Sequence, residues 1–369
     1  MTKKVMVAMS GGVDSSVAAV LLEEQGYEIC GATLKLYDNE DIGIDDRTRT
    51  CCSISDVEDA QMVANRLGIR HYVFNFGLHF GRDVIERFAE SYQRGETPNP
   101  CIDCNRYIKF SRLLERALLL GYDSIATGHY ANVEYDKVRG RYLLKKAKDT
   151  SKDQTYVLYA MTQQELARTL FPLGNMLKSE VREHAGAGSL VNAEKPDSQD
   201  ICFVKDNDYG DFLERVMGVV SPAGDFIDKK GKVLGQHRGL IHYTIGQRKG
   251  LGVGFGQRKY VTGLDKERNT VTLGDSEDLF RSSLIAEDIN LIAFEKLQEP
   301  MEVTAKTRYK QPETPATIFP MEDGRIRVEF KKPQRAITPG QAVVFYDKDI
   351  VVGGGTITTG SNKTGCEQE

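Results

Sequence analysis

A short run of serine and glycine near the amino terminus has the composition of a phosphate-binding loop. It consists of Ser10, Gly11, Gly12, Val13, Asp14, Ser15 and Ser16. The run lies between an apolar strand-like segment and a helix-like segment, where free backbone N–H groups and the positive end of the helix dipole favour an anion. The glycines permit close approach of the ligand, the hydroxyl groups add donors, and the carboxylate of Asp14 suits a metal ion better than a phosphate. The loop therefore predicts a site for a phosphorylated ligand.

Two other nucleotide-binding patterns are disfavoured. The pattern G-x-x-x-x-G-K-[ST], which is typical of enzymes that hydrolyse a γ-phosphate, is absent from the chain. Gly250, Gly252, Gly254 and Gly256 have the spacing of a dinucleotide loop, but no strand precedes them and no helix follows. We interpret these four glycines as a flexible hairpin.

The chain contains seven cysteines, an odd number that argues against a framework of disulfides. Cys101 and Cys104 form half of a typical zinc pattern, but the adjacent Cys51 and Cys52 lack the spacing of the other half. An iron–sulfur cluster built from some of these residues and Cys202 is a second alternative. Structural zinc and an iron–sulfur cluster are both less favoured than catalysis by the thiols, so we assign no metal ligands.

The first half of the chain alternates between strand and helix patterns. The predicted strands cover residues 4–9, 27–37, 71–76 and 124–127, and the predicted helices cover residues 14–25, 57–67, 84–92 and 110–120. Alternation of this kind requires crossover connections between parallel strands. The expected fold class is therefore an α/β, doubly wound, mainly parallel sheet.

The pattern changes after about residue 204. A helix is predicted at residues 211–217, and short alternating segments follow at residues 259–263, 270–274, 301–307, 326–330 and 342–346. We expect an α/β domain over residues 1–205, a central β-rich domain over 206–280, a C-terminal β-barrel over 281–360 and a tail over 361–369. A linker is expected near residues 275–283, where polar turn residues cluster.

Composition and charge indicate the kind of partner. The 369 residues are 40% hydrophobic and 28% charged, the formal net charge is −4, and no apolar run is long enough to span a membrane. We expect a cytoplasmic protein. Residues 137–152 hold seven basic residues and one acid, and residues 229–259 hold eight basic residues and no acid. These two basic islands favour an anionic macromolecule whose affinity falls with salt, whereas the acidic residues 38–59 are expected to lie away from its phosphates.

Longer motifs carry a resemblance to a known family. Segments 95–105 and 195–203 surround the cysteines, and shorter motifs occur at 126–131, 151–154 and 242–251. The serine and glycine loop resembles the pyrophosphate loop (PP-loop) of the ATP pyrophosphatases. The motifs together resemble the tRNA-specific 2-thiouridylase family from the first strand to residues 339–341.

The resemblance implies a sulfur-transfer reaction on tRNA. ATP, with Mg²⁺, would adenylate oxygen-2 of the wobble uridine, and sulfur would then replace AMP. Adenylation converts a poor leaving group into a good one, and a thiolate is a strong nucleophile at neutral pH. By analogy Cys202 carries the sulfur as a persulfide, delivered by a cysteine desulfurase or a sulfur-relay protein. Cys104 acts as the nucleophile that attacks the persulfide or the resulting disulfide linkage, leaving a Cys104–Cys202 disulfide bond.

Other roles transfer only at matching positions. The residues expected to bind ATP are Ala8, Met9, Ser10, Gly11, Gly12, Val13, Asp14, Ser15, Ser16, Leu34 and Gly128. The residues expected to contact tRNA are Asn99, Pro100, Cys101, His129, Lys152, Asp153, Gln154, Arg308, Tyr309 and Gln341. Of these, residues 99–101 are expected to hold the target base.

The chain departs from the family pattern at one position. Many members have an aspartate where Cys101 stands, and that aspartate is proposed to act as general acid or base. Asp103 is close in sequence, but its side chain need not point to the same place. We hypothesise that Cys101 replaces the acid/base group, or that it forms a regulatory disulfide with Cys104 in the resting protein.

Two other functions are alternatives to tRNA thiolation. One is a small-molecule ligase with a PP-loop, which would need an ammonia source, and no obvious glutaminase segment is present. The other is an RNA-binding regulator that carries zinc or an iron–sulfur cluster. The regulator would bind RNA without consuming ATP.

Overall fold

A computed structural model describes residues 2–37, 54–188, 190, 192–193, 195, 201–204, 208–252 and 258–358. Several predicted features lie outside this part of the chain. They are most of the acidic segment, Cys51, Cys52, Gly254, Gly256, the centre of the motif at 195–203, and the tail.

The amino-terminal part forms a parallel sheet. Five strands lie in the order β3 (His71–Asn75), β2 (Glu28–Lys35), β1 (Lys4–Ala8), β4 (Ser124–Thr127) and β7 (Thr169–Leu170), and every neighbouring pair is parallel. Strands β2 and β3 follow on one side of β1, and β4 and β7 follow on the other. The carboxyl end of β1 lies at this switch point, where α/β sheets bind their ligands.

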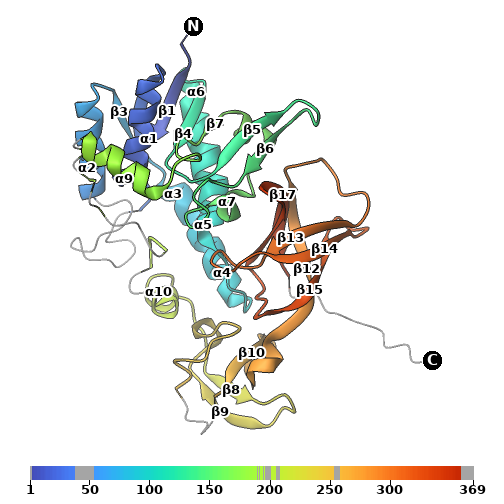
Figure 1. Cartoon of the computed structure of the whole chain (residues 1–369). Helices are drawn as coiled ribbons and strands as arrows, with labels where there is room; N and C mark the ends of the chain where they lie inside the picture. Colours follow the sequence, from blue (N-terminus) through green and yellow to red (C-terminus); the bar gives the residue numbers. More distant parts are fainter. Residues whose placement is uncertain are drawn as a thin grey trace.

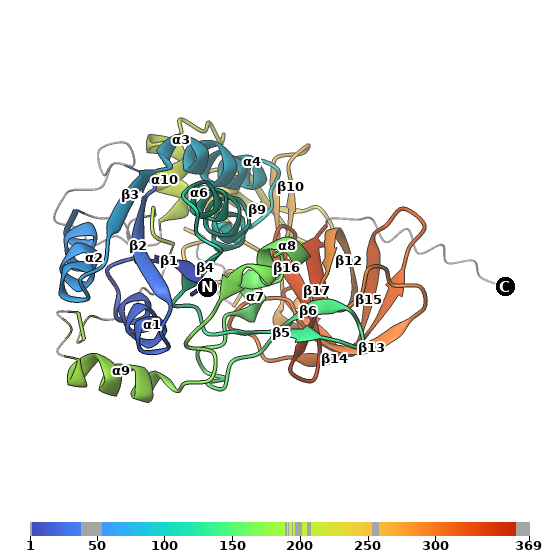
Figure 2. The same ribbon diagram turned by 90° about the horizontal axis from the view of Figure 1, so that it is seen from above.

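Helices cover both faces of this sheet (Figure 2). One face packs against α1 (Val13–Glu24), α2 (Ile54–Arg66) and α9 (Lys178–Ala187). The other face packs against two longer helical stretches. The first joins α3 (Gly77–Phe80), a π-helical turn at Gly81–Glu86 and α4 (Arg87–Gln93), and the second joins α5 (Pro100–Asp103), a π-helical stretch at Cys104–Arg112 and α6 (Leu113–Leu119). The predicted doubly wound fold is confirmed.

The second helical stretch begins ten residues earlier than predicted. Asn99 is the N-cap, and its side-chain oxygen accepts a hydrogen bond from the backbone N–H of Cys101 at 3.1 Å. Pro100 follows at the first helical position, where its missing N–H costs nothing. This pair of residues is a local start signal. It places Cys101 and Cys104 one turn apart on the same helix.

The central part is a small sheet. It contains β10 (Tyr260–Asp265), β11 (Thr270–Gly274), β8 (Gly224–Ile227) and β9 (Val233–His237), in that order. The helix α10 (Tyr209–Arg215) precedes it, and a 3₁₀ turn at Leu240–His242 packs against α10. In Figure 1 this sheet lies at the bottom, below α4.

The carboxyl-terminal part is a closed barrel. Its strands are β12 (Phe280–Leu291), β15 (Ile326–Arg335), β14 (Thr314–Pro320), β13 (Met301–Lys306), β16 (Ala342–Asp347) and β17 (Ile350–Ile357). The pairing of β12 with β17 closes the ring. The predicted barrel is confirmed, but the linker expected at 275–283 is wrong in part, because Ser276–Leu279 forms a 3₁₀ turn and β12 begins at Phe280. The polar residues that suggested a linker lie in this turn and at the exposed start of β12.

A hairpin from the first part extends the barrel sheet. It is formed by β5 (Asn132–Asp136) and β6 (Arg141–Lys145), and β6 pairs with β17 through Lys145 and Ile350. The chain then returns through α7 (Thr155–Leu158) and α8 (Gln163–Ala167) to β7. Asn290 of β12 donates to the carbonyl oxygens of Tyr159 and Met161, at 2.6 and 3.0 Å. The barrel is thus fixed to the parallel sheet by backbone pairing and by buried hydrogen bonds.

Candidate active site

The PP-loop joins the end of β1 to the start of α1. Ser15 accepts a hydrogen bond from the backbone N–H of Ser10 at 3.2 Å, and its hydroxyl donates to the carbonyl oxygen of Gly12 at 3.0 Å. Ser16 donates to the same carbonyl at 3.1 Å. The serines therefore hold the loop in shape from within the helix, and the start of α1 carries the positive end of its dipole.

Two glycines allow other segments to approach this loop closely. Gly11 has a φ of +71°, and a Cβ there would overlap the backbone of Asp56 at the start of α2. Gly128 follows β4, and a Cβ there would lie 2.7 Å from the backbone nitrogen of Ser15. Asp56 belongs to the end of the acidic segment, which therefore packs on the PP-loop; its placement relative to the phosphates of an RNA stays a prediction.

Asp14 forms a half-buried ion pair that the sequence did not indicate. The ammonium group of Lys178, at the start of α9, lies 2.7 and 2.8 Å from the two carboxylate oxygens of Asp14. The hydroxyl of Tyr130 donates to the same carboxylate at 2.9 Å. An ammonium group and a carboxylate therefore lie side by side at the loop. The ammonium group suits phosphate oxygens, and the carboxylate suits a hard metal ion.

The residues expected around the adenine lie at the ends of β1 and β2. Leu34 is buried in β2, and the hydroxyl of Thr33 donates to the carbonyl oxygen of Met9 at 2.7 Å. Ala8 ends β1. Along with Val13 and Gly12, these residues surround the carboxyl ends of the two central strands, which is the position that a nucleotide occupies in sheets of this type.

Cys101 and Cys104 lie on consecutive turns at the start of α5. Cys101 is exposed, whereas Cys104 is 8% exposed and belongs to the core on that face of the sheet. The structure shows both side chains as thiols. A backbone hydrogen bond joins the N–H of Cys104 to the carbonyl of Cys101. The exposed thiol can meet a substrate directly, while the buried thiol requires a partner that reaches into the helix layer.

Cys202 is brought to the same helix layer from almost a hundred residues downstream. Its carbonyl oxygen accepts a hydrogen bond from the hydroxyl of Tyr37 at 2.8 Å, just after the end of β2. The ring of Phe203 lies 5.7 Å from Phe80 and 5.4 Å from Phe88, in edge-on contacts. Cys202 is half-buried and packs against the core cluster that contains Cys104.

Several residues expected to bind tRNA join the three parts of the chain to one another. Gln341 donates to the carbonyl oxygen of Thr97 at 2.7 Å, and the backbone of Thr97 donates to that of Pro339 at 2.9 Å. Arg308 is directed inward and donates to the carbonyl oxygens of Ile245 and Ala336 at 3.1 and 3.0 Å. Arg308 therefore contacts both the central part and the barrel part of the chain, and Gln341 joins the barrel part to the segment that precedes α5. These contacts within the protein are independent of any contact with RNA.

Asp153 and Cys101 lie near Tyr309, where the barrel faces the catalytic part. Asp153 accepts hydrogen bonds from the hydroxyl of Thr155 at 2.6 Å and from the backbone of Ala147 at 3.0 Å, and burial raises its pKa. The pKa of Tyr309 is raised by burial and then by the negative charges of Asp153 and Cys101, so the three groups are electrostatic neighbours. Nothing in the local sequence around Cys101 indicated this contact with the barrel.

The remaining expected tRNA contacts lie on the loops between this junction and the PP-loop. Gln154 accepts a hydrogen bond from the backbone of Tyr130 at 2.9 Å, and the backbone N–H of Lys152 donates to the carbonyl of Asp149. Since Tyr130 also contacts Asp14, a continuous set of contacts leads from the PP-loop to the junction. Asn99 and Pro100 are occupied in starting α5.

His129 is held neutral between aromatic rings. Its Nδ1 atom lies 2.8 Å from the hydroxyl of Thr127, and its ring centroid lies 5.8 Å from that of Phe110 and 6.2 Å from that of Phe171. Burial, and then the charge of Lys109, lower the pKa of His129 well below its usual value of 6.5. At neutral pH His129 is therefore an uncharged, hydrogen-bonding ring rather than a positive charge.

This lowered pKa predicts a loss of stability in acid. Below a pH of about 6.5 the unfolded chain binds a proton at His129 and the folded protein does not, so the free energy of unfolding falls by up to about 1.4 kcal/mol per pH unit. We expect His129→Gln to show a shallower fall in urea unfolding at pH 5 to 7. His71 and His237, whose pKa values burial also lowers, are common to both proteins. Identical curves for the two proteins would contradict the assignment.

The two basic islands are partly neutralised in the fold. In residues 137–152, Lys145 lies 3.0 Å from Glu134, Lys146 lies 2.6 Å from Glu313, and Lys148 lies 3.1 Å from Glu180. In residues 229–259, Lys229 pairs with Asp278 and Lys259 with Asp275. The charge available to an RNA is therefore smaller than the sequence counts suggest, because distant carboxylates fold against these lysines.

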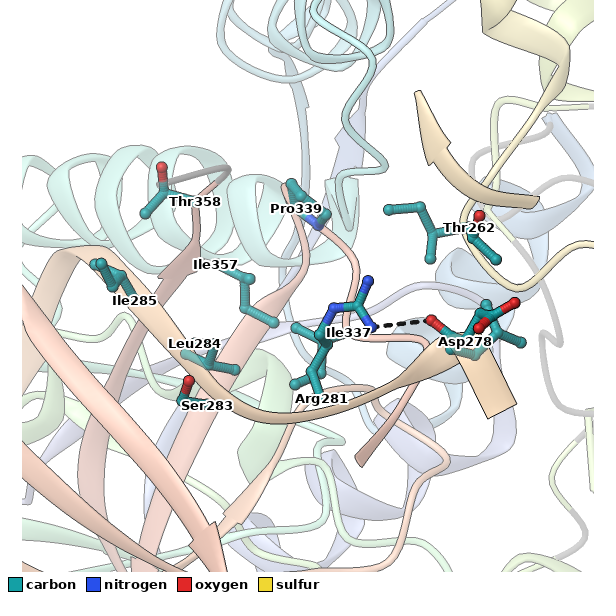
Figure 3. A pocket seen from close by; sticks show the side chains of 12 residues that line it. Thr262, Asp278, Arg281, Ser283, Leu284, Ile285, Ile337, Pro339, Ile357 and Thr358 are labelled. Atoms are coloured by element: carbon teal, nitrogen blue, oxygen red, sulfur yellow. Dashed lines mark hydrogen bonds between the residues drawn. The ribbon is translucent and has the colours of Figure 1, made fainter. Parts of the chain in front are cut away.

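A cleft lies between the central sheet and the barrel (Figure 3). It has a volume of about 200 Å³ and is lined on one side by Ile245 and on the other by Pro339. Arg281 crosses it and donates to the carbonyl oxygen of Asp278 at 2.9 Å. Ile245 also accepts a hydrogen bond from Arg308, and Pro339 accepts one from Thr97. The cleft therefore adjoins the contacts between the three parts of the chain rather than the PP-loop.

Among the described residues, no three His, Cys, Asp or Glu side chains gather closely enough to hold a metal ion. Within that part of the chain, no helix is both long and apolar enough to cross a membrane. Cys51 and Cys52, which the zinc and iron–sulfur alternatives invoked, lie outside the described residues.

The sequence analysis missed Lys178, Tyr130 and Asn192 at the PP-loop. Lys178 lies 164 residues from Asp14, and Asn192 lies 176 residues from Ser16. No local periodicity connects such positions. Lys195 was part of a recognised motif, but the sequence assigned no role to it.

Comparison with known proteins identifies the family. Family models match residues 3–206 (tRNA methyl transferase HUP domain), 210–275 (tRNA methyl transferase PRC-barrel domain) and 281–357 (aminomethyltransferase beta-barrel domain). The tRNA-specific 2-thiouridylase MnmA of Acetivibrio thermocellus is 55% identical over 355 residues, which cover 96% of this chain and 99% of that protein. The tRNA-specific 2-thiouridylase MnmA 1 of Thermoanaerobacter sp. is 55% identical over 96% of this chain and 97% of that protein, and MnmA of Caldicellulosiruptor saccharolyticus is 54% identical over 97% and 99%. With this identity along nearly its whole length, the chain belongs to the tRNA-specific 2-thiouridylase family.

Proposed function

We propose that this protein is a tRNA 2-thiouridylase that uses ATP to replace oxygen-2 of the wobble uridine with sulfur, releasing AMP and pyrophosphate. The observation that carries the proposal is the joint placement of a PP-loop and two cysteine-bearing segments on one parallel sheet. Tyr37, immediately after β2, holds the backbone of Cys202, and the helix that starts at Asn99 presents Cys101 and Cys104. The relatives named above share this chain over nearly their full length.

The proposed reaction has two chemical stages. In the first, oxygen-2 of the uridine attacks the α-phosphorus of ATP, and pyrophosphate leaves. In the second, the outer sulfur of a Cys202 persulfide attacks carbon-2 and AMP leaves with the original oxygen. The thiolate of Cys104 then attacks the Cys202 sulfur, which releases 2-thiouridine and forms a Cys104–Cys202 disulfide. An external dithiol restores both thiols.

The side chains at the PP-loop suit the first stage. The backbone of residues 10–16 and the start of α1 would hold the phosphates, with Leu34 against the adenine and Gly128 leaving room for the nucleotide. Lys178 can contact a phosphate oxygen once ATP reaches Asp14. The carboxylate of Asp14 and the neighbouring serine hydroxyls are hard oxygen donors that suit Mg²⁺, which would neutralise phosphate charge when bound.

The proposed partners follow from the chemistry. The substrate is tRNA, whose target base would lie at residues 99–101, close to Tyr309 and Asp153. The sulfur comes from a cysteine desulfurase or a sulfur-relay protein, because the chain itself offers thiols but no source of sulfane sulfur. Such an enzyme would work in the cytoplasm, where tRNA and reduced thiols are present.

The test is a reconstituted sulfur transfer. The purified protein is incubated with ATP, Mg²⁺, tRNA and a cysteine desulfurase that is supplied with ³⁵S-cysteine, and the digested tRNA is separated by chromatography. We expect labelled 2-thiouridine and one AMP for each sulfur transferred. RNA binding with neither AMP nor label would instead support the regulator. AMP formation that depends on ammonia and a small molecule, without tRNA, would support the ligase.

The position of Cys101 leads to a prediction about acid/base catalysis. Its thiol is exposed one turn before Cys104 and lies near Tyr309, so we propose that it exchanges a proton with the substrate in place of the usual aspartate. Under fully reducing conditions Cys101→Ser should lower kcat about 100-fold, the usual share of a general acid or base. Cys101→Asp should recover turnover with a pH–rate profile shifted towards acid. If Cys101→Ser loses nothing when reduced but resists oxidative inactivation, the thiol serves a resting Cys101–Cys104 disulfide, and full turnover at all redox potentials removes both roles.

A further inference from the structure

The carbonyl oxygen of Gly11, in the PP-loop, is held by two side chains from far along the chain. The side-chain amide of Asn192 donates to this oxygen at 3.0 Å, and the ammonium group of Lys195 lies 3.2 Å from it. The same amide nitrogen lies 2.8 Å from the hydroxyl oxygen of Ser16. Asn192 is only 3% exposed, so these contacts are shielded from water. A change in the direction of the Gly11 carbonyl would leave a buried amide donor without its acceptor, which is costly.

The ammonium group of Lys195 is fully occupied by contacts within the protein. Besides the Gly11 carbonyl oxygen, it meets a carboxylate oxygen of Asp56 at 2.6 Å and one of Asp59 at 2.7 Å. An ammonium group has three N–H donors, and these three acceptors use all of them. A lysine beside a phosphate-binding loop is commonly a ligand of the phosphate. Lys195 instead holds the loop against α2.

The N–H group of Gly12 belongs to the same peptide unit as the Gly11 carbonyl. The peptide bond between the two glycines is trans, so its C=O and N–H groups point in opposite directions. Because Asn192 and Lys195 hold the C=O group, the N–H group is directed away from them. This N–H donates to no acceptor in the described part of the chain, and Gly12 is half-buried. The unit thus presents a backbone donor to a ligand at the start of α1.

Glycine at both positions makes this peptide unit easy to reverse. Reversal of the unit would change the φ of Gly12 from −88° to about +90°, a region that is open to glycine and strained for other residues. The serine hydroxyls hold only the next unit, because Ser15 and Ser16 donate to the carbonyl oxygen of Gly12 at 3.0 and 3.1 Å. The unit between Gly11 and Gly12 therefore relies on the two distant side chains.

We propose that Asn192 and Lys195 are positioning residues for ATP, which lock the Gly11–Gly12 peptide unit with its N–H group directed at the β- and γ-phosphates. The proposal rests on the function proposed above, which assigns the phosphates of ATP to the PP-loop. A reversed unit would present a carbonyl oxygen to the phosphates, so that a donor would be replaced by a repulsive group. A donor that is already locked needs no reorganisation when its anion arrives. The two side chains thus contribute to the affinity for ATP without touching the nucleotide.

The experiment measures the binding of ATP and of AMP to the full chain by isothermal titration calorimetry, with Mg²⁺ and without tRNA. Asn192→Leu removes the amide and keeps a side chain of similar size. We expect the Kd for ATP to rise about tenfold or more, which is the usual effect of losing one hydrogen bond to a charged group. The Kd for AMP should stay unchanged, because AMP lacks the two phosphates that the locked N–H would meet.

A substitution at Gly12 tests the orientation of the peptide unit itself. An alanine at this position fits the observed φ of −88°, since the nearest atom to its Cβ would be the hydroxyl oxygen of Ser10 at 3.5 Å, but it disfavours the reversed unit. Asn192→Leu should therefore raise the Kd for ATP by a smaller factor in the Gly12→Ala background than in the wild-type background. The same factor in both backgrounds would show that Asn192 does not act on this unit.

Asn290→Leu is the matched control. The side-chain amide of Asn290 also donates to two backbone carbonyl oxygens, those of Tyr159 and Met161, where the barrel meets the catalytic part. This variant should lose stability for the same reason and keep both Kd values. Lys195→Met is a second route to the same result if Asn192→Leu does not fold. It should raise the Kd for ATP more than the Kd for AMP.

The binding measurement needs neither tRNA nor a sulfur donor, so the two proposals can fail separately. A wild-type protein that binds no ATP, or that binds ATP and forms no 2-thiouridine in the reconstituted reaction, would refute the proposed function. A wild-type protein that passes both tests, beside an Asn192→Leu or Lys195→Met protein that binds ATP equally well or loses affinity for ATP and AMP by the same factor, would refute the positioning role alone.

Discussion

Replacement of Cys202 by serine is expected to abolish the formation of 2-thiouridine while ATP-dependent adenylation of the tRNA continues. A serine hydroxyl cannot carry sulfane sulfur, whereas the PP-loop and the proposed binding site of the base at residues 99–101 do not depend on this side chain. Without a persulfide, the adenylated uridine is consumed only by hydrolysis. AMP and pyrophosphate are therefore released slowly, and no sulfur is incorporated. The measurement is ³⁵S in tRNA nucleosides beside pyrophosphate release in the same reaction. Sulfur incorporation equal to that of the wild-type protein would refute the persulfide role.

The matched variant Cys104→Ser separates the roles of the two thiols. If the Cys202 persulfide attacks the base directly, no thiolate remains to release the product, and tRNA stays joined to Cys202 through a disulfide. We then expect a protein–tRNA adduct on a denaturing gel that dithiothreitol resolves into protein and 2-thiouridine. If Cys104 instead attacks the persulfide first and releases hydrosulfide, this variant forms no adduct. A Cys104→Ser protein with wild-type turnover would exclude both orders of events.

The second large effect is expected at Gly11. An alanine at a φ of +71° is strained, and its Cβ would overlap the backbone of Asp56, so the start of α2 must move or the loop must change shape. Either change misplaces the phosphate-binding N–H groups and breaks the hydrogen bonds of Asn192 and Lys195 to the Gly11 carbonyl. A displacement of about 1 Å in such a site costs about 100-fold in rate. We therefore expect Gly11→Ala to lower kcat/KM for ATP about 100-fold.

Gly26→Ala is the control for backbone strain. Gly26 ends the same helix with a φ of +81°, but no atom lies within 4 Å of the position that its Cβ would take. This variant should lose about 1 kcal/mol of stability and keep its activity. Comparable kcat/KM values for the two variants, at similar melting temperatures, would show that the contact with α2 is unimportant.

Much of the parallel sheet could be predicted because its signals are local. The strand expected at residues 4–9 is observed as β1 at Lys4–Ala8, and the helix expected at 14–25 is observed as α1 at Val13–Glu24. Apolar periodicity and a terminal glycine determine such elements within a few residues. The PP-loop was recognisable for the same reason, since a strand, a turn and a helix that are adjacent in sequence build it.

The elements that were missed depend on distant partners. The sequence of the β5–β6 hairpin has the composition of a charged loop. The hairpin is stabilised by pairing with β17, about two hundred residues later. The start of α5 was not predicted, although Asn99 and Pro100 form a local capping signal. The start of β12 is polar and exposed, and it therefore has the composition of a linker. For the hairpin and for β12, the surrounding fold rather than propensity determines the conformation.

The sequence by itself determined the family, the α/β fold class, the anion-binding loop and the thiols that are candidates for sulfur transfer. The tertiary structure decided which groups meet them. It placed Lys178 on Asp14, brought Asn192 and Lys195 to the Gly11 carbonyl, turned Arg308 inward and paired many lysines of the basic islands with carboxylates. The physical reason is the range of the interactions. Helix starts and tight turns arise between neighbours in sequence, whereas buried ion pairs and hydrogen bonds form between side chains that only the packing of distant segments brings together.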